Sequence, residues 1–228
     1  MSSLQDERSA ETRRRLLDAT VACLSERGYA GTTTTEIANR AGVSRGAQLH
    51  HFPKKDELVV SALEHVFELR LSEMSAAIAE RPSGSREHRI AMLIDAMWPM
   101  FKGPTFCAWL ELVVASRTDP ALNDAVRAAS VRFGERFREG LGALLDWPDD
   151  QQDKLQDLIS IVFGQLEALA LERVLFAPGE IDPPQFARAL ETAKRVSVAM
   201  VRQLQGPAPA PEIGGPAPLS PEEKNLTP

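Results

Sequence analysis

Two short, capped helices separated by a glycine constrain the fold of this chain more than any other feature. Thr33 and Glu36 form the Thr-x-x-Glu pattern, in which each side chain satisfies a free backbone N–H at the start of a helix. Gly42 stands where a left-handed residue would end that helix. Ser44 can cap a further helix that runs to about Phe52. The pattern predicts a helix-turn-helix, in which a tight turn joins two helices.

The rest of the chain is also predicted to be helical, because apolar residues recur at helical spacing and no alternating strand pattern is present. In addition to the two short helices, and divided by proline and glycine breaks, we expect helices over residues 8–27, 56–80, 86–101, 105–118, 120–145, 150–176 and 184–205. The expected architecture is all-α, with nine helices in two parts. These parts are a helix-turn-helix domain over 8–55 and a helical body over 56–205. A disordered, proline-rich tail is expected over 206–228.

Charge is distributed unevenly along the chain. The net charge of −6 opposes nucleic-acid binding, which usually accompanies an excess of Lys and Arg. Residues 1–60, however, carry nine Lys and Arg against eight Asp and Glu, whereas the remaining residues carry seventeen against twenty-four. A neutral-to-basic head on an acidic body fits a nucleic-acid-binding module joined to a larger domain of another kind.

The sequence lacks the features of an exported or membrane-bound protein. Its N-terminal segment has neither the basic start nor the apolar run of a secretory signal, and no segment approaches the ~18 apolar residues of a membrane span. Cys23 and Cys107 are too few and too far apart for a disulfide framework. We expect a cytoplasmic protein with no membrane partner.

Catalysis and metal binding have little support in the sequence. His50 and His51 are adjacent, but neighbouring residues on a helix point about 100° apart and cannot face one metal or one substrate together. The Glu-x-x-His and His-Glu-x-x-His patterns of helical metalloenzymes do not occur with these residues, His65 or His88. The expectation is a protein that is not an enzyme, with no catalytic site, no metal site and no cofactor.

The segment TTTTEIANRAGVSRGAQLHHFPKKDELV, preceded by RRRLLDATVACLSERGYAG, resembles the TetR family of transcriptional regulators over about residues 12–63. The capping threonines, the Ala-Gly-Val-Ser turn, the glycine after it, the terminal Phe and the Lys-x-x-Leu that enters the next helix all occur at the family's spacing. The resemblance implies that the second short helix enters the major groove of DNA. It also implies that the helical body binds a ligand and forms dimers.

The resemblance implies a set of DNA-contacting residues on and around the second short helix. They are Thr33, Thr34, Thr35, Ser44, Arg45, Gly46, Ala47, Gln48, Leu49, His51 and Lys55. Arg45 is the candidate for base readout, since its guanidinium can donate two hydrogen bonds to guanine; contact with phosphate or solvent is the alternative. Gln48 can pair with adenine, although the family usually has an apolar residue there and an aromatic one at the position of Leu49.

The other residues of this set have supporting roles in the hypothesis. His51 and Lys55 match positions near the DNA backbone, and a docked phosphate would offset the cost of a lysine at a helix N-terminus. Gly46 allows a close approach to the groove or is simply a turn residue. One threonine is needed as the helix cap, and the others contact the DNA backbone or face water. Val43 and Phe52 are expected in the core.

The body is expected to hold a small-molecule effector near its Gly103-Pro104 break, where large apolar residues concentrate. The candidate lining residues are Met92, Trp98, Phe101, Phe106 and Trp109, which suit either a roomy apolar cavity or a plain core. The implied effector is hydrophobic. Glu111, between two leucines, is assigned to a solvated helix face rather than to a polar anchor in such a cavity.

The last two predicted helices carry apolar residues on more than one face, which indicates that they are covered on more than one side. A central position within one subunit and a contact with a second copy both fit this periodicity, and the resemblance implies the second. The candidate dimerisation residues are Leu155, Leu158, Ile159, Val162, Leu166, Leu169, Phe186, Leu190, Val196 and Met200. A two-fold homodimer places two recognition helices about one DNA turn, or a multiple of it, apart on a pseudo-palindromic double-stranded operator.

These features together predict a DNA-binding transcriptional regulator. The expected mechanism is that of a dimeric repressor that a small hydrophobic ligand releases from its operator, with the helix that begins near Asp56 as the hinge. A helical adaptor that binds only protein, with the helix-turn-helix as a scaffold, is the alternative.

Overall fold

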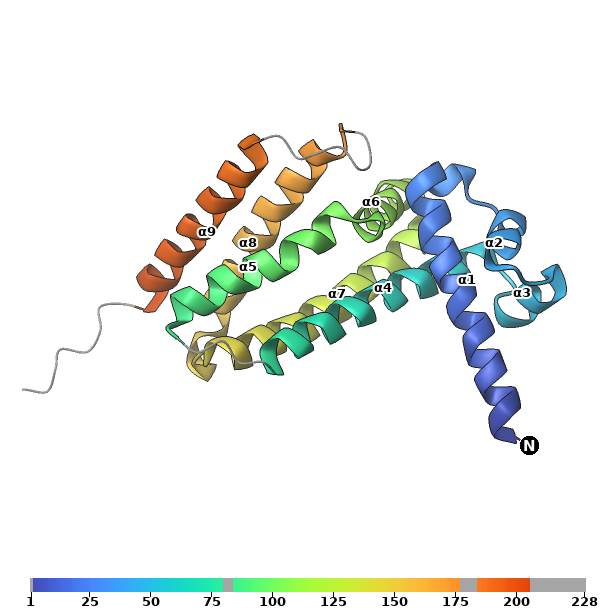
Figure 1. Ribbon diagram of the computed structural model, residues 1–228, viewed down its shortest axis with the longest axis horizontal. Coiled ribbons are helices and arrows are strands. Elements are labelled where there is room, and N and C mark those ends of the chain that lie inside the picture. The colour runs from blue at the N-terminus through green and yellow to red at the C-terminus, as the bar shows by residue number, and fades with distance from the viewer. Residues whose placement is uncertain (1, 80–83, 177–183, 206–228) are drawn as a thin grey trace, which may run out of the picture.

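The computed structural model describes residues 2–79, 84–176 and 184–205, and within these ranges the chain is a set of helices with short connections (Figure 1). The helices are α1 (Ser2–Gly31), α2 (Thr34–Ala41), α3 (Arg45–His51), α4 (Lys55–Ala79), α5 (Arg86–Lys102), α6 (Pro104–Ser116), α7 (Pro120–Leu145), the 3₁₀ turn η1 (Asp149–Gln151), α8 (Gln152–Arg173) and α9 (Pro184–Gln205). The prediction of an all-α chain with nine α-helices is confirmed for the described residues. The predicted tail, 206–228, lies outside them.

The first helix is longer than the sequence predicted. It begins at Ser2 rather than near residue 8, and it continues past Gly28 to Gly31. Gly28 has φ 68° and ψ 175°, a backbone conformation outside the helical region that glycine adopts without steric cost. The glycine therefore breaks α1, where the sequence predicted an end, and one more turn follows the break.

The Thr33 and Ser44 caps predicted for the two short helices are present, whereas the Glu36 side chain, predicted to complete the box, pairs with Arg27 at 2.9 Å. Thr33 Oγ1 accepts a hydrogen bond of 3.2 Å from the backbone N–H three residues later, and Ser44 Oγ does the same at 3.1 Å. Gly42 ends α2 in the left-handed conformation, with φ 63°. Val43 packs against the core and Phe52 is buried in it, which confirms the roles predicted for both residues. Local signals in the sequence thus determine the helix-turn-helix.

Two hydrophobic cores meet along α4. The N-terminal core consists of Leu16, Leu17, Ala19, Val21, Cys23, Leu24, Ile37, Ala41, Phe52, Leu58, Val59, Ala62, Leu63, Val66, Phe67, Ala108, Leu112, Leu122, Val126 and Ala129. The C-terminal core is built from α5 to α9 together with Leu71 and Met74 of α4. Since α4 supplies side chains to both cores, it joins α1–α3 to the rest of the molecule. The domain boundary predicted at residue 55 falls within the region that the N-terminal core spans.

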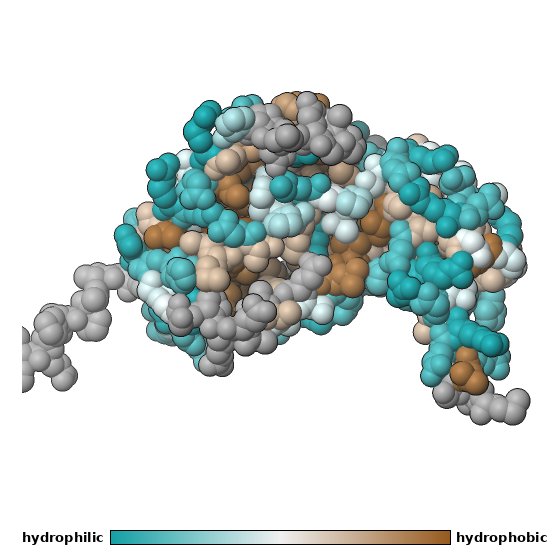
Figure 2. All heavy atoms as spheres, in the orientation of Figure 1, coloured by the Kyte–Doolittle hydropathy of each residue, from teal (hydrophilic) through white to brown (hydrophobic). Residues whose placement is uncertain are grey.

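The connection through α4 places α1–α3 at one end of the molecule. α1, α2 and α3 lie at one end, and α4 and α7 run side by side from there along the body toward α8 and α9 (Figure 1). Figure 2 shows hydrophilic side chains over much of the end that carries α2 and α3, whereas apolar side chains reach the surface near the middle of the view. No helix in the described ranges combines the length and the apolar character that a membrane crossing requires.

The geometry of the turn between α2 and α3 can be tested at Gly42, which has positive φ. Gly42→Ala is expected to lower the free energy of unfolding by about 1 kcal/mol, because a Cβ is disfavoured at positive φ. The new Cβ would also lie 2.7 Å from Arg15 Nη2. Gly46→Ala, inside α3, is the control and is expected to raise stability by roughly 0.5–1 kcal/mol through helix propensity. Urea unfolding of both variants measures the difference, and equal stability of the two would contradict the turn geometry.

Candidate functional site

The exposed start of α3 lies beside the start of α2. Arg45 Nη1 donates hydrogen bonds to Thr35 Oγ1 at 2.6 Å and to Thr34 Oγ1 at 3.2 Å. Both helix starts are solvent-exposed there, with Gly46 and Ser44 exposed on the same turn of α3. The structure therefore brings five of the predicted contact residues into one polar surface. A guanidinium has five N–H donors, so this arrangement leaves Arg45 with capacity for further acceptors.

Gln48 does not belong to this surface, which corrects the expectation that it contacts bases. Its side chain is 0% exposed, and its Nε2 donates a hydrogen bond of 2.6 Å to Phe52 O. Gln48 Oε1 is buried with no hydrogen-bond partner among the described residues. The amide faces inward because α3 turns the side of residue 48 toward the core beside Phe52. Gln48 thus ties the last turn of α3 to the carbonyl that follows it.

The other residues of α3 that were predicted to contact DNA differ in their exposure. Leu49 is 44% exposed, whereas Ala47 and His51 are half-buried. Burial lowers the pKa of His51, and the neighbouring charges of His50 and Arg13 lower it further. In the absence of DNA the imidazole is therefore less protonated at a given pH than a free histidine.

Lys55 lies in the junction between α1 and α4, which differs from the exposed position expected for it. Its Nζ donates a hydrogen bond of 2.7 Å to Tyr29 O and lies 4.0 Å from the centroid of the Tyr29 ring. Burial lowers the pKa of Lys55, although the neighbouring Asp56 raises it in part. Tyr29 in turn donates from its hydroxyl to Asp56 Oδ1 at 3.0 Å, and burial together with Asp56 raises its pKa to about 12. The phosphate contact of Lys55 stays a prediction, and it requires the ammonium to share or leave Tyr29.

Two hydrogen-bonded contacts were not predicted, because their partners are far apart in the sequence. Arg15 of α1 donates from Nη2 to the carbonyl oxygens of Ala41 and Gly42, at 3.1 Å for the second, and so holds the turn between α2 and α3. Glu111 of α6 accepts a hydrogen bond of 3.0 Å from Tyr29 N, which corrects its assignment to a solvated face. Neither contact has a local signal in the sequence.

An aromatic cavity of about 210 Å³ lies within the body. Its lining residues are Phe67, Arg70, Phe101, Phe106, Trp109, Ser130, Phe133, Gly134, Phe137, Ile159, Phe163 and Glu167. Three of the five residues proposed for a ligand site, Phe101, Phe106 and Trp109, are among them. The other two are not: Met92 is 44% exposed on the surface of α5, and Trp98 is buried in the C-terminal core. The rings from α7 and α8 were missed because periodicity alone does not show which helix faces meet.

Two ionisable groups of opposite charge lie in this cavity. Arg70 is 7% exposed, and its Nη2 donates to Thr105 Oγ1 at 3.1 Å and to Met100 O at 3.3 Å. Glu167 is half-buried; burial raises its pKa, and the positive charge of Arg70 opposes that rise. The cavity therefore combines aromatic walls with a cation and a carboxyl group, which can orient a ligand that is mostly apolar but carries a polar substituent.

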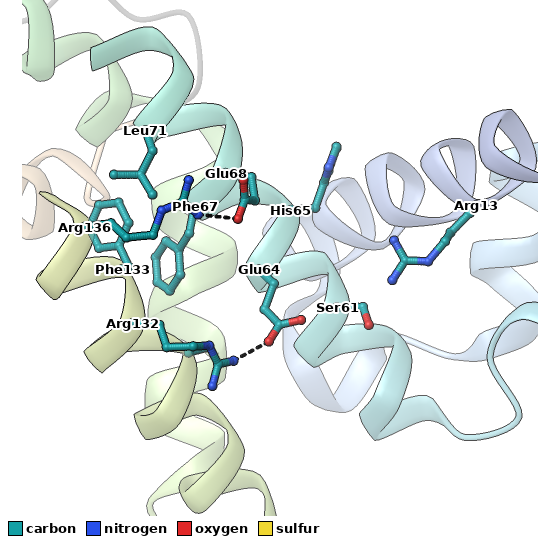
Figure 3. Close-up of a pocket in the computed structure, with 11 residues that line it drawn as sticks. Arg13, Ser61, Glu64, His65, Phe67, Glu68, Leu71, Arg132, Phe133 and Arg136 are labelled. Atoms are coloured by element: carbon teal, nitrogen blue, oxygen red, sulfur yellow. Dashed lines mark hydrogen bonds and ion pairs between the residues drawn. The ribbon is translucent and has the colours of Figure 1, made fainter. Parts of the chain in front are cut away.

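A charged groove of about 430 Å³ lies on the other side of one cavity wall, between α1, α4 and α7 (Figure 3). The Phe67 and Phe133 rings stack with centroids 4.4 Å apart and line both the groove and the cavity. Beside them, Arg136 pairs with Glu68 at 2.5 Å. A second ion pair joins Arg132 and Glu64 in the same way, and both cross from α7 to α4 in Figure 3. These contacts hold α4 against α7 along the length that separates groove from cavity.

Most residues proposed for dimerisation lie inside the chain, which corrects their assignment. Leu155, Leu158, Ile159, Val162, Leu166 and Phe186 are buried, Leu169, Leu190 and Met200 are partly buried against the C-terminal core, and Val196 is 47% exposed. The regular apolar stripe of α8 is covered by α5, α7 and α9 of the same chain. Residues that point in other directions, Ile161, Leu171 and Leu175, are exposed instead.

The histidines and cysteines that the sequence raised as candidates lie in the following surroundings in the described part of the chain. The His50 and His51 rings meet edge to face with centroids 5.5 Å apart. No group of three or more His, Cys, Asp or Glu side chains within the described ranges is placed to hold a metal ion. Cys23 is buried, and burial raises the pKa of its thiol.

A capped helix-turn-helix joined through one helix to a larger helical body is the architecture of a DNA-binding regulator. Three comparisons with known proteins agree with this class. The model of the bacterial regulatory proteins of the tetR family matches residues 16–62. The HTH-type transcriptional regulator CymR of Pseudomonas putida is 33% identical over 173 residues, which cover 73% of this chain and 81% of CymR.

Solved structures share the fold over most of their length. A transcriptional regulator from Rhodococcus sp. Rha1 superposes with a TM-score of 0.61 at 23% identity, covering 84% of this chain and 96% of that one. The multidrug binding protein EbrR, complexed with imidazole, gives a TM-score of 0.56 at 23% identity, covering 87% and 97%. The chain belongs to the TetR family of bacterial transcriptional regulators. It is a DNA-binding transcriptional regulator.

Gln48 provides a test of how α3 is built. Gln48→Ala is expected to lower the free energy of unfolding by about 1–3 kcal/mol, because the Phe52 carbonyl loses its buried donor. Base preference is expected to stay the same, since the side chain does not reach the exposed surface. Leu49→Ala is the neighbouring control, with a loss within about 0.5 kcal/mol expected for an exposed site. Denaturant unfolding and binding-site selection from random DNA give the two readouts; a changed preference at one base position would restore Gln48 as a base contact.

Proposed function

We propose that this regulator is a dimeric repressor whose two α3 helices bind a pseudo-palindromic operator and which a small, mostly hydrophobic ligand releases. The observation that carries the proposal is the continuity of α4. Leu58 and Val59 of this helix are buried in the N-terminal core, and Phe67 and Arg70, about two to three turns later, line the cavity. A ligand in the cavity thus contacts the same rigid element that supports the helix-turn-helix.

Cavity chemistry supports a ligand of one small ring system with a polar substituent. The aromatic walls favour an apolar body, and Arg70 and Glu167 offer a donor and an acceptor at its edge. Imidazole bound to EbrR is an example of a small ring compound in a protein of this fold. Release requires only that the ligand bind more tightly to the conformation with low DNA affinity, because the shift in population equals the difference between its two affinities.

The outward face of α8 supports a homodimer. Ile161, Gly164, Ala168 and Leu171 are all exposed and recur at intervals of three and four residues. This is the spacing of an apolar seam between helices, and the small residues in its centre allow close approach. A Cβ at Gly164 would have nothing within 4 Å, so the face is open to a partner. On the neighbouring α9, Val196 and Ala199 are exposed as well.

The two-fold symmetry of the proposed dimer determines how it binds DNA. A two-fold axis between the paired α8 and α9 helices presents two copies of α3 to DNA, and each copy then contacts one half of a pseudo-palindromic site. The distance between the two copies determines which half-site spacing fits. A ligand that changes this distance changes operator affinity without any contact to DNA.

Arg45 is expected to determine part of the operator sequence. Arg45→Ala should relax base preference at one position of each half-site, at a cost of about 1–3 kcal/mol for the lost bidentate contact. Arg40→Ala is the matched control: it removes the same charge, but Arg40 pairs with Glu26 on the exposed side of α2. Selection from random DNA followed by gel shifts over a salt series measures both variants. Unchanged preference in Arg45→Ala contradicts the assignment.

The same measurements separate a regulator from a protein-binding adaptor. A regulator is expected to select a sequence and to lose affinity linearly as the logarithm of salt concentration rises. Selection of no sequence by the unmodified chain, or binding that is insensitive to salt, would support the adaptor.

The dimer face has its own test. Leu171→Glu is expected to convert the dimer to a monomer, because each dimer would bury two carboxylates without partners in its apolar interface. Val114→Glu is the control, since Val114 is 58% exposed on α6 and Leu171 55% exposed. Sedimentation velocity at several concentrations gives the mass. A Leu171→Glu chain that remains dimeric, or an unmodified chain that is monomeric throughout, rules out this face.

A further inference from the structure

Glu111 bonds to the protein backbone at the break in α1. Its Oε2 accepts a hydrogen bond of 3.0 Å from Tyr29 N. Gly28 provides the space for this contact, since a Cβ on Gly28 would lie 2.8 Å from the same oxygen. Hydrogen bonds from a backbone N–H to a carboxylate are stronger than those between neutral groups. The bond therefore attaches the end of α1 to α6.

Tyr29 is also attached to the first turn of α4 and to the segment that enters α2. Its carbonyl accepts from Lys55 Nζ at 2.7 Å and from Thr32 N at 3.3 Å. Its hydroxyl donates to Asp56 Oδ1 at 3.0 Å. One residue thus connects α1, α4, α6 and the start of the helix-turn-helix. A displacement of Glu111 acts on all of these elements through Tyr29.

α6 lies between the N-terminal core and the cavity. Ala108 and Leu112 are buried in the N-terminal core, against α1, which lies beside α6 in Figure 1. Phe106 and Trp109 line the cavity from the same helix. Glu111 follows Trp109 by two residues, so a compound that pushes against these rings moves the carboxylate as well. α6 is short, with 13 residues, so a displacement at Phe106 or Trp109 is expected to move the whole helix.

We propose that Glu111 is a positioning residue through which occupancy of the cavity changes the orientation of α2 and α3. The proposal rests on the ligand-responsive function proposed above. It differs from a signal that travels along α4 alone, because α6 and Tyr29 form a second connection. With the cavity empty, the Glu111 bond holds the helix-turn-helix in the arrangement that binds the operator. With the cavity filled, α6 shifts and this arrangement is lost.

The bond is tested with Glu111→Ala and Glu111→Gln, on an operator fragment selected from random DNA by the unmodified chain. Both variants remove one negative charge, which by itself would strengthen DNA binding equally in both. Only Gln keeps an oxygen that can accept from Tyr29 N–H. We expect Glu111→Ala to bind the operator about tenfold more weakly and Glu111→Gln to stay within about twofold of the unmodified chain. The slope of log affinity against log salt should not change, since no phosphate contact is removed.

Glu135→Ala is the matched control, because it removes a carboxylate from an exposed position on α7 of the same body. Thermal unfolding of each variant gives the folded fraction at the assay temperature. Unchanged operator affinity in Glu111→Ala overturns the proposal. Equal weakening by Ala and Gln overturns it too, and so does weakening that only follows a loss of folded protein. Either outcome shows that the hydrogen bond does not position the helix-turn-helix.

A substitution that partly fills the cavity tests whether cavity occupancy weakens operator binding through Glu111. Gly134 lines the cavity from an exposed position, and a Cβ there would have nothing within 4 Å, so Gly134→Met adds a long apolar side chain at the opening of the cavity, where it can occupy part of the space of a ligand. We expect Gly134→Met to weaken operator binding in the otherwise unmodified chain and to have little further effect in Glu111→Ala. Equal weakening in both backgrounds, or none in the first, overturns the route through Glu111. Failure of the unmodified chain to select any operator contradicts the proposed function instead.

Discussion

The burial of one continuous helix, α4, in two hydrophobic cores is the constraint on which the rest of the structure depends. Leu58 and Val59 fix its first half against α1, and Leu71 and Met74 fix its second half against α5 and its neighbours. An α-helix is stiff along its axis, so neither core can rotate freely relative to the other. The ion pairs from α7 to α4 add contacts along the same line. The DNA-binding end and the cavity therefore form one mechanical unit.

The local features of the helix-turn-helix could be predicted because each depends on neighbours within a few residues. Thr33 and Ser44 cap the N–H groups that follow them, and Gly42 adopts positive φ at the end of the same short helix. All the residues that produce these local features are close together in the sequence. For Gln48, neighbouring residues were not sufficient to predict the direction of the side chain. Its polarity suggested a contact with DNA, but in the folded chain Gln48 is buried and its amide donates to Phe52 O.

The predictions for the body were less accurate for a different physical reason. Periodicity shows that a helix has an apolar stripe but not which helix covers it. Leu158 and Leu166 belong to the strongest stripe of α8 and are covered by the same chain, whereas the less regular Leu171 remains exposed. The cavity walls were found only in part, because Phe133 and Phe163 come from helices distant in sequence from the aromatic cluster. Contacts such as Tyr29 with Glu111 likewise need the folded chain.

The position of Arg45 over Thr34 and Thr35 has a consequence for recognition. A long side chain that is free in solution loses roughly 0.5–1.5 kcal/mol of rotamer freedom when an interface immobilises it. Arg45 is already confined by two hydroxyl groups before DNA arrives, so part of that entropy is lost during folding rather than during binding. The two short helices thus meet the groove as a preformed template. In the proposed operator complex, discrimination between sites is then expected to depend mainly on the fit of this template to the base edges and little on ordering after contact.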